Sequence, residues 1–315
     1  MDLKRLLMPS VLQADEKLYY RRDERTEIQP DGSIKFGLDG RVDFDTYFNS
    51  FSTGKWAKYT HVERVQAALV TEGTFSIELV YQYLEQEEIK TEVLSTTEVT
   101  SQEPKTFIFD FGKNREQGMF FFRCQALAED SVLHGGKYLS ENLMPTNMKV
   151  NFMVDICTFR REEYVYRNLE LLRKDILENP ESPLCHHLYV HISDNAKTLD
   201  SSVADGDFVK ITPNRNVGGV GGFTRGIIEA LNRSKQQDIS HVLLMDDDAM
   251  IEPACLETNY TFLTVLKEEY RDYTFAGAIM QLDKTWSQYE RGAQWNEGYI
   301  NALRHKVDMR KPINL

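Results

Sequence analysis

The stretch "VLLMDDDAMIEP", Val242–Pro253, decides which fold this sequence encodes. Four apolar residues of a buried-strand pattern end in three consecutive aspartates, Asp246, Asp247 and Asp248. Three adjacent carboxylates repel one another unless a positive charge lies among them. The stretch therefore raises two questions: which cation the aspartates meet, and to what kind of sheet the strand belongs.

The residues around this stretch alternate between strand and helix patterns. Segments with apolar side chains at helical spacing, such as Leu169, Leu172 and Ile176, separate apolar runs of strand length. The predicted strands are "VNFMVDICTF", "HLYVHISDNA", "GDFVKITPN" and "HVLLMDDD". This alternation predicts an α/β, Rossmann-like domain over residues 146–315, with a parallel sheet covered on both faces by helices.

Residues 1–145 show a different pattern, in which apolar side chains recur at every second position. In "TFSIELVYQY", Phe75, Ile77 and Leu79 share one face while polar side chains occupy the other. The run "KTFIFDF" alternates likewise, and the polar, glycine-bounded "GKNREQG" separates it from "MFFFRCQALA", which predicts a hairpin. We expect an antiparallel β-sandwich or jelly-roll domain here.

Composition narrows the class of protein. The 315 residues carry a formal net charge of -12, which disfavours nucleic acid as a partner because phosphate binding needs clustered Lys and Arg. Neither a signal peptide nor an apolar run of transmembrane length is present in the sequence. We expect a cytoplasmic protein, with association at a membrane surface left open. Its cysteines have no metal-site spacing and are expected to be reduced: Cys124, Cys157, Cys185 and Cys255.

The triple aspartate is placed where a parallel sheet binds ligands, outside the carboxyl ends of its strands. Alternate aspartates, here Asp246 and Asp248, can direct their oxygens to one point. Mg²⁺ or Mn²⁺ is typically held by one or two carboxylates plus substrate phosphates. We therefore expect these two aspartates to hold Mg²⁺ or Mn²⁺ against a nucleotide diphosphate. The alternative is an exposed acidic turn before a helix, and the D-x-D pattern alone does not decide.

Other predicted strand ends carry polar or glycine residues. "NVGGVGGFTRG", Asn216–Gly226, lets the backbone approach phosphate or sugar oxygens, although flexible-turn glycines are the alternative. Thr158 and Arg161 follow the first strand and could meet a pyrimidine or a diphosphate. Asp194 ends the second strand, where it could bind a base or ribose or simply cap a turn.

Taken in order, "CTFRR", "SDN", "NVGGVGGFTRG" and "MDDDAMIEP" resemble the family-two glycosyltransferases of GT-A fold. More narrowly, they resemble the polymerising galactofuranosyltransferases of the mycobacterial arabinogalactan type. "FDTYFNSFSTGKWAKYT" and "GAIMQLDKTWSQYERGAQW" extend the similarity over nearly the whole chain. The resemblance implies inverting transfer of a sugar, galactofuranose, from a UDP donor to a hydroxyl of a lipid-linked cell-surface glycan. It also leads us to expect a homo-oligomer, peripheral to the cytoplasmic face of the membrane.

The resemblance assigns roles to individual residues. It makes Asp246 and Asp248 the ligands of Mn²⁺ or Mg²⁺, and places Glu290, the catalytic candidate, near the sugars. The general base is expected beyond Leu315, because no segment after the aspartates matches the aromatic-rich region of the family. We therefore expect a truncated chain with little or no turnover. The donor-binding residues implied are Thr158, Arg161, Asp194, Asn216, Gly218, Gly219, Asp246, Asp247 and Trp295.

Three other functions are open. The first is a non-catalytic, two-domain carbohydrate-binding protein, in which Tyr47, Trp56 and Tyr59 would stack on sugars, although such aromatics more often form core. The second is a transferase using another nucleotide sugar, such as a rhamnosyl donor. The third is a phosphohydrolase, which is weak because Asp155 is not part of an Asp-x-Asp-x-Thr arrangement.

Overall fold

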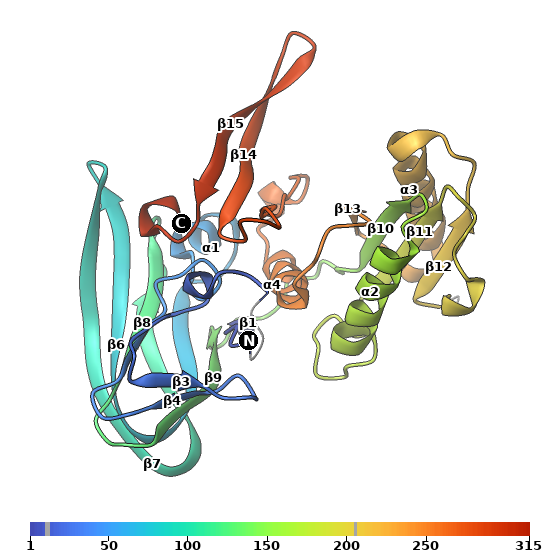
Figure 1. The fold of residues 1–315 in the computed structure, drawn as a ribbon. Coiled ribbons are helices and arrows are strands. Elements are labelled where there is room, and N and C mark those ends of the chain that lie inside the picture. Colours follow the sequence, from blue (N-terminus) through green and yellow to red (C-terminus); the bar gives the residue numbers. More distant parts are fainter. Residues whose placement is uncertain (10–12, 205–206) are drawn as a thin grey trace. The chain divides into compact units, whose positions relative to one another are not determined.

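The chain, drawn from a computed structural model in Figure 1, forms two compact units. Unit 1 comprises Met1–Met144 and Leu266–Leu315, and unit 2 comprises Pro145–Val265. Residues 266–315 were predicted to belong to the α/β domain, and their place in unit 1 corrects the predicted extent of that domain. The described residues are 1–9, 13–204 and 207–315.

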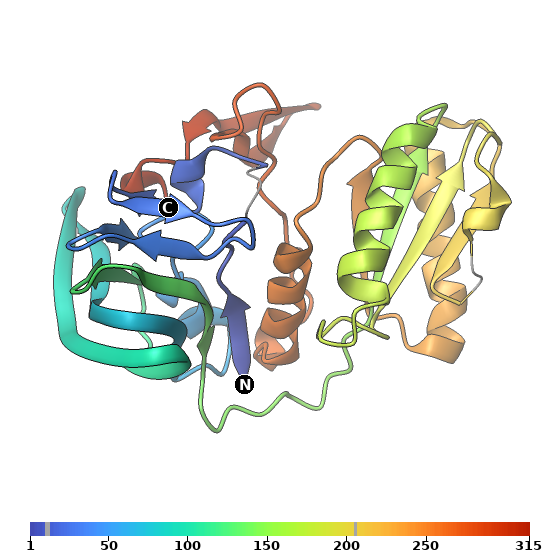
Figure 2. The same cartoon turned by 60° about the horizontal axis from the view of Figure 1, so that its bottom comes forward.

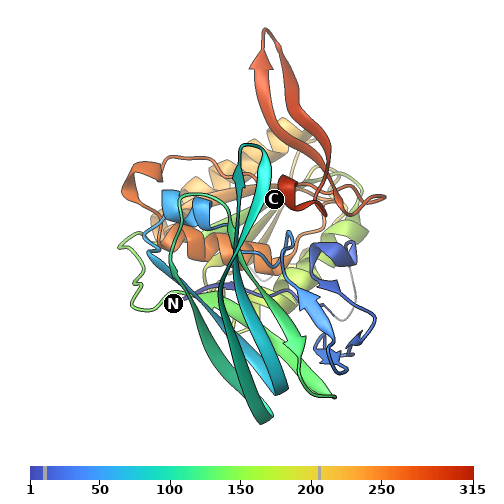
Figure 3. The ribbon, with the colours of Figure 1, turned by 90° about the vertical axis from the view of Figure 1, so that its left-hand side faces the viewer.

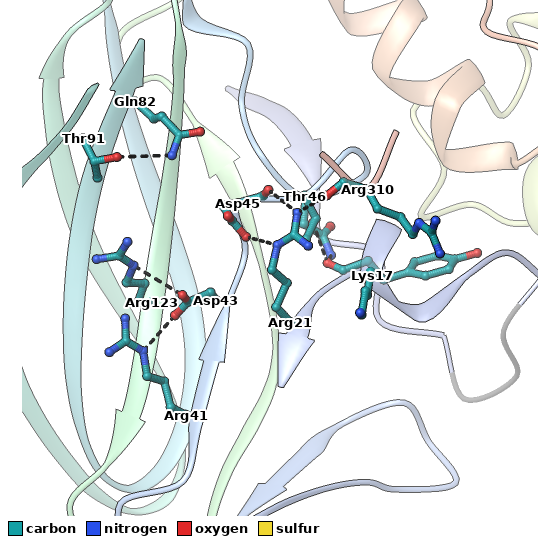
Figure 4. Close-up of polar contacts among 12 residues, drawn as sticks. Lys17, Arg21, Arg41, Asp43, Asp45, Thr46, Gln82, Thr91, Arg123 and Arg310 are labelled. Atoms are coloured by element: carbon teal, nitrogen blue, oxygen red, sulfur yellow. Dashed lines mark hydrogen bonds and ion pairs between the residues drawn. The ribbon is translucent and has the colours of Figure 1, made fainter. Parts of the chain in front are cut away.

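The C-terminal segment belongs to unit 1 because its side chains pack there. Val307 and Met309 form a buried apolar cluster with Leu18. The Arg21 guanidinium donates a hydrogen bond of 2.6 Å to the carbonyl oxygen of Arg310, a residue 289 positions away (Figure 4). Contacts over such a separation leave no trace in local periodicity, which is why the sequence pattern did not predict them.

Unit 1 is an antiparallel β structure, as predicted. Among the described residues, nine strands form one sheet in the order β2-β5-β8-β6-β9-β4-β3, with β1 beside β9 and β7 beside β6. A separate two-stranded sheet pairs β14 with β15, and one helix, α1 (Thr53–Tyr59), precedes β6. The strands are β1 (Asp2–Arg5), β2 (Arg21–Arg22), β3 (Thr26–Ile28), β4 (Ile34–Phe36), β5 (Arg41–Asp43), β6 (Arg64–Glu85), β7 (Glu88–Lys113), β8 (Met119–Ala126), β9 (Ser131–Leu139), β14 (Ser287–Asn296) and β15 (Tyr299–Asp308).

The long strand β6 has partner strands along both of its edges, and Figure 3 shows it within the sheet. Along one edge it pairs with β7, and along the other it pairs first with β9 and then with β8. The change of partner occurs at Gly73, whose φ is +92°. A Cβ there would lie 2.4 Å from Oγ of Ser131, so only glycine fits this close, left-handed position.

The hairpin predicted across "GKNREQG" is wrong. β7 and β8 lie on opposite edges of β6, so this segment crosses from one edge to the other. The observed hairpin joins β6 to β7 through Gln86 and Glu87, both at positive φ. Two-residue hairpin turns of this kind usually use Asn or Gly, and their absence removed the sequence signal.

Aromatic rings fill the interior of unit 1. Phe44 stacks on Phe122 with ring centroids 4.4 Å apart, and Phe111 stacks on Phe120 at 4.9 Å. Trp56 is buried, and its ring stacks on that of Phe51. The core role that the sequence favoured for Trp56 is therefore confirmed.

Unit 2 contains a four-stranded parallel sheet in the order β12-β11-β10-β13. Figure 2 shows α2 and α3 on opposite faces of this sheet. Within the described residues, no helix combines the length and apolar character needed to span a membrane. The elements are β10 (Phe152–Thr158), α2 (Glu162–Leu172), β11 (Leu188–Asp194), β12 (Val209–Pro213), α3 (Gly218–Gln237), β13 (His241–Asp246) and α4 (Pro253–Thr264).

Candidate functional site

The carboxyl ends of the parallel strands bring predicted site residues to one edge of unit 2. In the register, Thr158 at the end of β10 lies opposite Asp194 at the end of β11. On the other side of β10, Cys157 lies opposite Asp246, where β13 ends. Strand ends separated by up to 89 positions in the chain are thus neighbours, as the predicted parallel sheet requires.

The three aspartates do not share one environment. Asp246 and Asp248 are exposed, whereas Asp247 is only 6% exposed. The Asp247 carboxylate accepts hydrogen bonds from Thr158 Oγ1 at 2.8 Å and from Arg161 Nη1 at 3.2 Å. The alternation leaves the first and third carboxylates on the surface and uses the second to fix the end of β13.

Asn168 on α2 is a site residue that sequence reasoning missed. Its side-chain amide donates to the carbonyl oxygens of Asp247 and Ala249, at 3.0 and 2.9 Å. It is 1% exposed and lies among the apolar residues of α2, close to Val165 and Leu169. A polar residue at a buried helical position was the available signal, because such a group needs a specific partner.

Arg161 is the positive charge that meets the acidic triplet. Its Nη1 atom forms ion pairs with both Asp247 and Asp248. The charge of Asp247, followed by the contacts with Asp248, raises the pKa of Arg161 above its usual value. Asp246 has no side-chain hydrogen bond or ion pair with the described residues. The three aspartates and Arg161 together carry a formal charge of −2.

The donor set of this edge suits a divalent cation that is completed by a ligand. Asp246 and Asp248 supply two exposed carboxylates, and the local charge is negative. Within the described residues, no group of three or more His, Cys, Asp or Glu side chains could enclose a metal ion. Mg²⁺ and Mn²⁺ sites with one or two carboxylates are normally filled by substrate phosphates and water, so the residues present fit that type of site.

Asp194 makes the contacts of a turn-capping residue, which was the alternative to nucleotide binding in the sequence analysis. It is 1% exposed, and its carboxylate accepts hydrogen bonds from the backbone N–H groups of Ala196, Lys197 and Leu199 at 2.8 to 3.0 Å. These bonds order the loop after β11. Contact of Asp194 with a base or ribose remains a prediction.

The glycine-rich segment divides into two parts. Asn216, Gly218 and Gly219 are exposed at the start of α3, where the Asn216 side chain accepts a hydrogen bond from the backbone N–H of Gly218 at 3.1 Å. Gly218 has a φ of +76°. The helix was predicted to open at "GGFTRG", but it begins at Gly218, so the later glycines lie within its first turns rather than in a loop.

Gly222 and Gly226 let α3 lie close to β10. A Cβ on Gly222 would lie 2.1 Å from Sγ of Cys157, and one on Gly226 would lie 1.9 Å from the carboxyl group of Asp155. Their spacing of four residues places both on one face of the helix. Helix–sheet packing therefore accounts for these two glycines, a role that the sequence interpretation did not include.

Glu290 and Trp295 lie outside unit 2, on the β14–β15 hairpin of unit 1. Trp295 is 69% exposed and lies opposite Ile300. Oε1 of Glu290 is 4.0 Å from Nδ1 of His305, and both side chains are about half exposed. Their predicted roles toward donor and acceptor sugars stay predictions.

Comparison with known proteins gives this geometry a context. Residues 3–140 match the family described as "Galactofuranosyltransferase 2 N-terminal". Over those residues, the chain has the resemblance to the polymerising galactofuranosyltransferases that its sequence indicated. In particular, it is 26% identical to galactofuranosyltransferase GlfT2 of Mycolicibacterium smegmatis and 25% identical to GlfT2 of Mycobacterium tuberculosis. Each alignment covers 70% of this chain, and the chain spans 34% of the length of each relative.

Solved structures give more distant similarities. The CBM22-1 and GH10 modules of Clostridium thermocellum xylanase 10B match 62% of this chain and 38% of theirs, with 10% identity and a TM-score of 0.30. The CBM22-1 xylan-binding domain of Paenibacillus barcinonensis Xyn10C matches 40% of this chain and 87% of its own, with 8% identity and a TM-score of 0.27. TM-scores this low support no conclusion on function.

Proposed function

We propose that unit 2 is a GT-A-type donor-binding domain that binds a UDP-sugar together with Mn²⁺ or Mg²⁺, in an inverting galactofuranosyltransferase. One observation carries the proposal: the exposed carboxylates of Asp246 and Asp248 flank a buried Asp247 at the carboxyl edge of the parallel sheet. That edge is where open α/β sheets bind ligands. Relatedness to the galactofuranosyltransferases supports the choice of reaction.

Each residue at this edge has a stated role in the proposal. Asp246 and Asp248 hold the cation, which when bound neutralises charge on the departing diphosphate. The N-terminus of α3, with Gly218 and Gly219, faces the phosphates, since a helix N-terminus favours anions. Thr158 keeps the Asp247 carboxylate in place through its hydrogen bond of 2.8 Å.

The sugar and the acceptor belong to the finer part of the proposal. We assign galactofuranose as the transferred sugar and a hydroxyl of a lipid-linked glycan as the acceptor. Inverting transfer needs a base within hydrogen-bond reach of the acceptor hydroxyl, and we assign that role to no residue of this chain. The expected turnover of the 315-residue chain is accordingly little or none, whereas nucleotide binding is expected.

Calorimetry with UDP tests the proposal. We expect UDP to bind the wild-type chain in the presence of Mn²⁺, and binding to be lost in the double variant Asp246→Ala/Asp248→Ala, which removes both cation ligands. The control is Glu268→Ala/Glu269→Ala, which removes the same charge from exposed positions in unit 1. UDP binding that is absent in wild type, or that survives in the aspartate variant, would refute the assignment.

A further inference from the structure

We infer that Arg161 exchanges partners when ligands bind: it leaves the acidic triplet as the cation arrives and pairs instead with the diphosphate. The cation and the nucleotide would then bind cooperatively, with Arg161 as the residue that couples them. This inference rests on the proposed function. It assigns Arg161 a positioning role that differs from simple contact with the nucleotide.

The position of Arg161 makes such an exchange possible. It occupies the N-cap position of α2, in the turn that follows β10, and its side chain makes no capping hydrogen bond there. Its side chain is 49% exposed, so the guanidinium can swing away without unpacking the core of unit 2. The side chain of Asp248, one partner, is 48% exposed, whereas Asp247, the other, is buried and retains the hydrogen bond from Thr158.

Arg161 and the cation compete for the carboxylate of Asp248. Asp248 is one of the two proposed cation ligands, and a guanidinium nitrogen already contacts its Oδ2 atom. A cation bound by both carboxylates would bring a second positive charge beside Arg161, and like charges at contact distance repel. Cation binding without nucleotide must therefore break or weaken the Arg161–Asp248 pair.

A diphosphate offsets the loss of the Arg161–Asp248 ion pair. Arginine forms bidentate, charge-assisted hydrogen bonds with phosphate oxygens, so the released guanidinium gains a new anionic partner beside the site. The cation then raises the affinity for the nucleotide, and the nucleotide raises the affinity for the cation by the same factor. Without such a partner change, Arg161 would only screen the triplet, and its removal would alter cation affinity without altering the coupling.

The test measures Mn²⁺ binding by electron paramagnetic resonance, with and without saturating UDP, and with the Mn²⁺–UDP complex in solution subtracted. For Arg161→Gln we expect Mn²⁺ alone to bind about two- to fivefold more tightly than in wild type, as for a partly exposed ion pair. The factor by which UDP strengthens Mn²⁺ binding should fall by a similar amount. Arg160→Gln is the matched control, because it removes the same charge from a side chain that lies over the ring of Phe159.

Arg161→Lys gives a second measure, because it keeps the charge but loses the planar fork. Its Mn²⁺ affinity without UDP should fall between those of wild type and Arg161→Gln. Wild-type coupling in Arg161→Gln, or equal effects of Arg160→Gln and Arg161→Gln, would overturn the inference and leave the proposed function intact. If the wild-type chain bound neither Mn²⁺ nor UDP, both the inference on Arg161 and the proposed function would be refuted.

Discussion

Unit 1 and unit 2 place their polar groups in opposite ways. Unit 1 buries aromatic rings and keeps ion pairs near its surface, where Asp43 lies between Arg41 and Arg123 (Figure 4). Unit 2 buries ionisable groups inside its sheet: Asp155 and His191 are both 0% exposed and lie 3.0 Å apart. Burial of polar groups costs stability unless they are paired, so unit 1 has the character of a scaffold. In unit 2, the contact between Asp155 and His191 offsets part of that cost.

The largest expected effect breaks the aromatic core of unit 1. Phe120 is fully buried and stacks on Phe111, so Phe120→Ala should lower the free energy of unfolding by about 3–5 kcal/mol. Urea denaturation followed by tryptophan fluorescence measures the change. The control is Ile108→Ala on β7, where the side chain is 56% exposed and the loss should stay within about 0.5 kcal/mol. Equal losses in the two variants would contradict the core that we describe.

The next effect concerns the close packing of α3 on the sheet of unit 2. Gly226→Ala would place a methyl group 1.9 Å from the Asp155 carboxyl group and should destabilise the protein by about 1–3 kcal/mol. Gly219→Ala is the matched control, since the nearest atom to its Cβ is 3.9 Å away, in the side chain of Phe223. In a helix that change should be neutral or stabilise by up to about 1 kcal/mol. Thermal unfolding of the two variants separates the outcomes, and a stabilising Gly226→Ala would contradict the packing.

The smallest effect tests a surface ion pair of unit 1. The hydrogen bonds from Arg310 lower the pKa of Asp308 below its usual value. The stability that this carboxylate contributes is therefore present above the unfolded pKa, near 4, and is lost as pH falls through the lowered value.

Asp308→Asn should cost at most about 1 kcal/mol at pH 7, because the pair is partly exposed, and nothing at strongly acid pH. Urea midpoints at pH 7 and pH 3 measure the difference, with Asp272→Asn at an exposed position as the control. A difference between wild type and Asp308→Asn that persists undiminished in acid would refute the contribution of the ion pair.

The elements of the fold that could be predicted are those with a local sequence pattern of apolar and polar residues. The four parallel strands and the shared edge of Thr158, Asp194 and Asp246 follow from apolar runs that end in polar residues. The edge-switching of β6 at Gly73 could not be predicted, because it depends on which distant strands arrive on either side. The attachment of residues 266–315 to unit 1 was missed for the same reason.

The candidate site was predictable to a similar degree. The acidic triplet was recognisable as a cluster, but its division into a buried Asp247 and two exposed neighbours depends on Thr158 and Asn168, which lie 89 and 79 positions away. The glycine-rich segment suggested ligand approach throughout. Gly222 and Gly226 instead serve packing, which sequence alone does not distinguish, because both roles require the absence of a Cβ.

The length of β7 has a consequence for how this protein behaves at high concentration. In the described part of the chain, β7 takes β6 as its pairing strand, so its 26 residues present a long outer rim of backbone amides and carbonyls. Such rims template aggregation unless charges keep other molecules away. The exposed Glu92, Glu98 and Glu103 supply mutual repulsion between copies. Replacing these three side chains with glutamine should therefore promote association between copies at neutral pH.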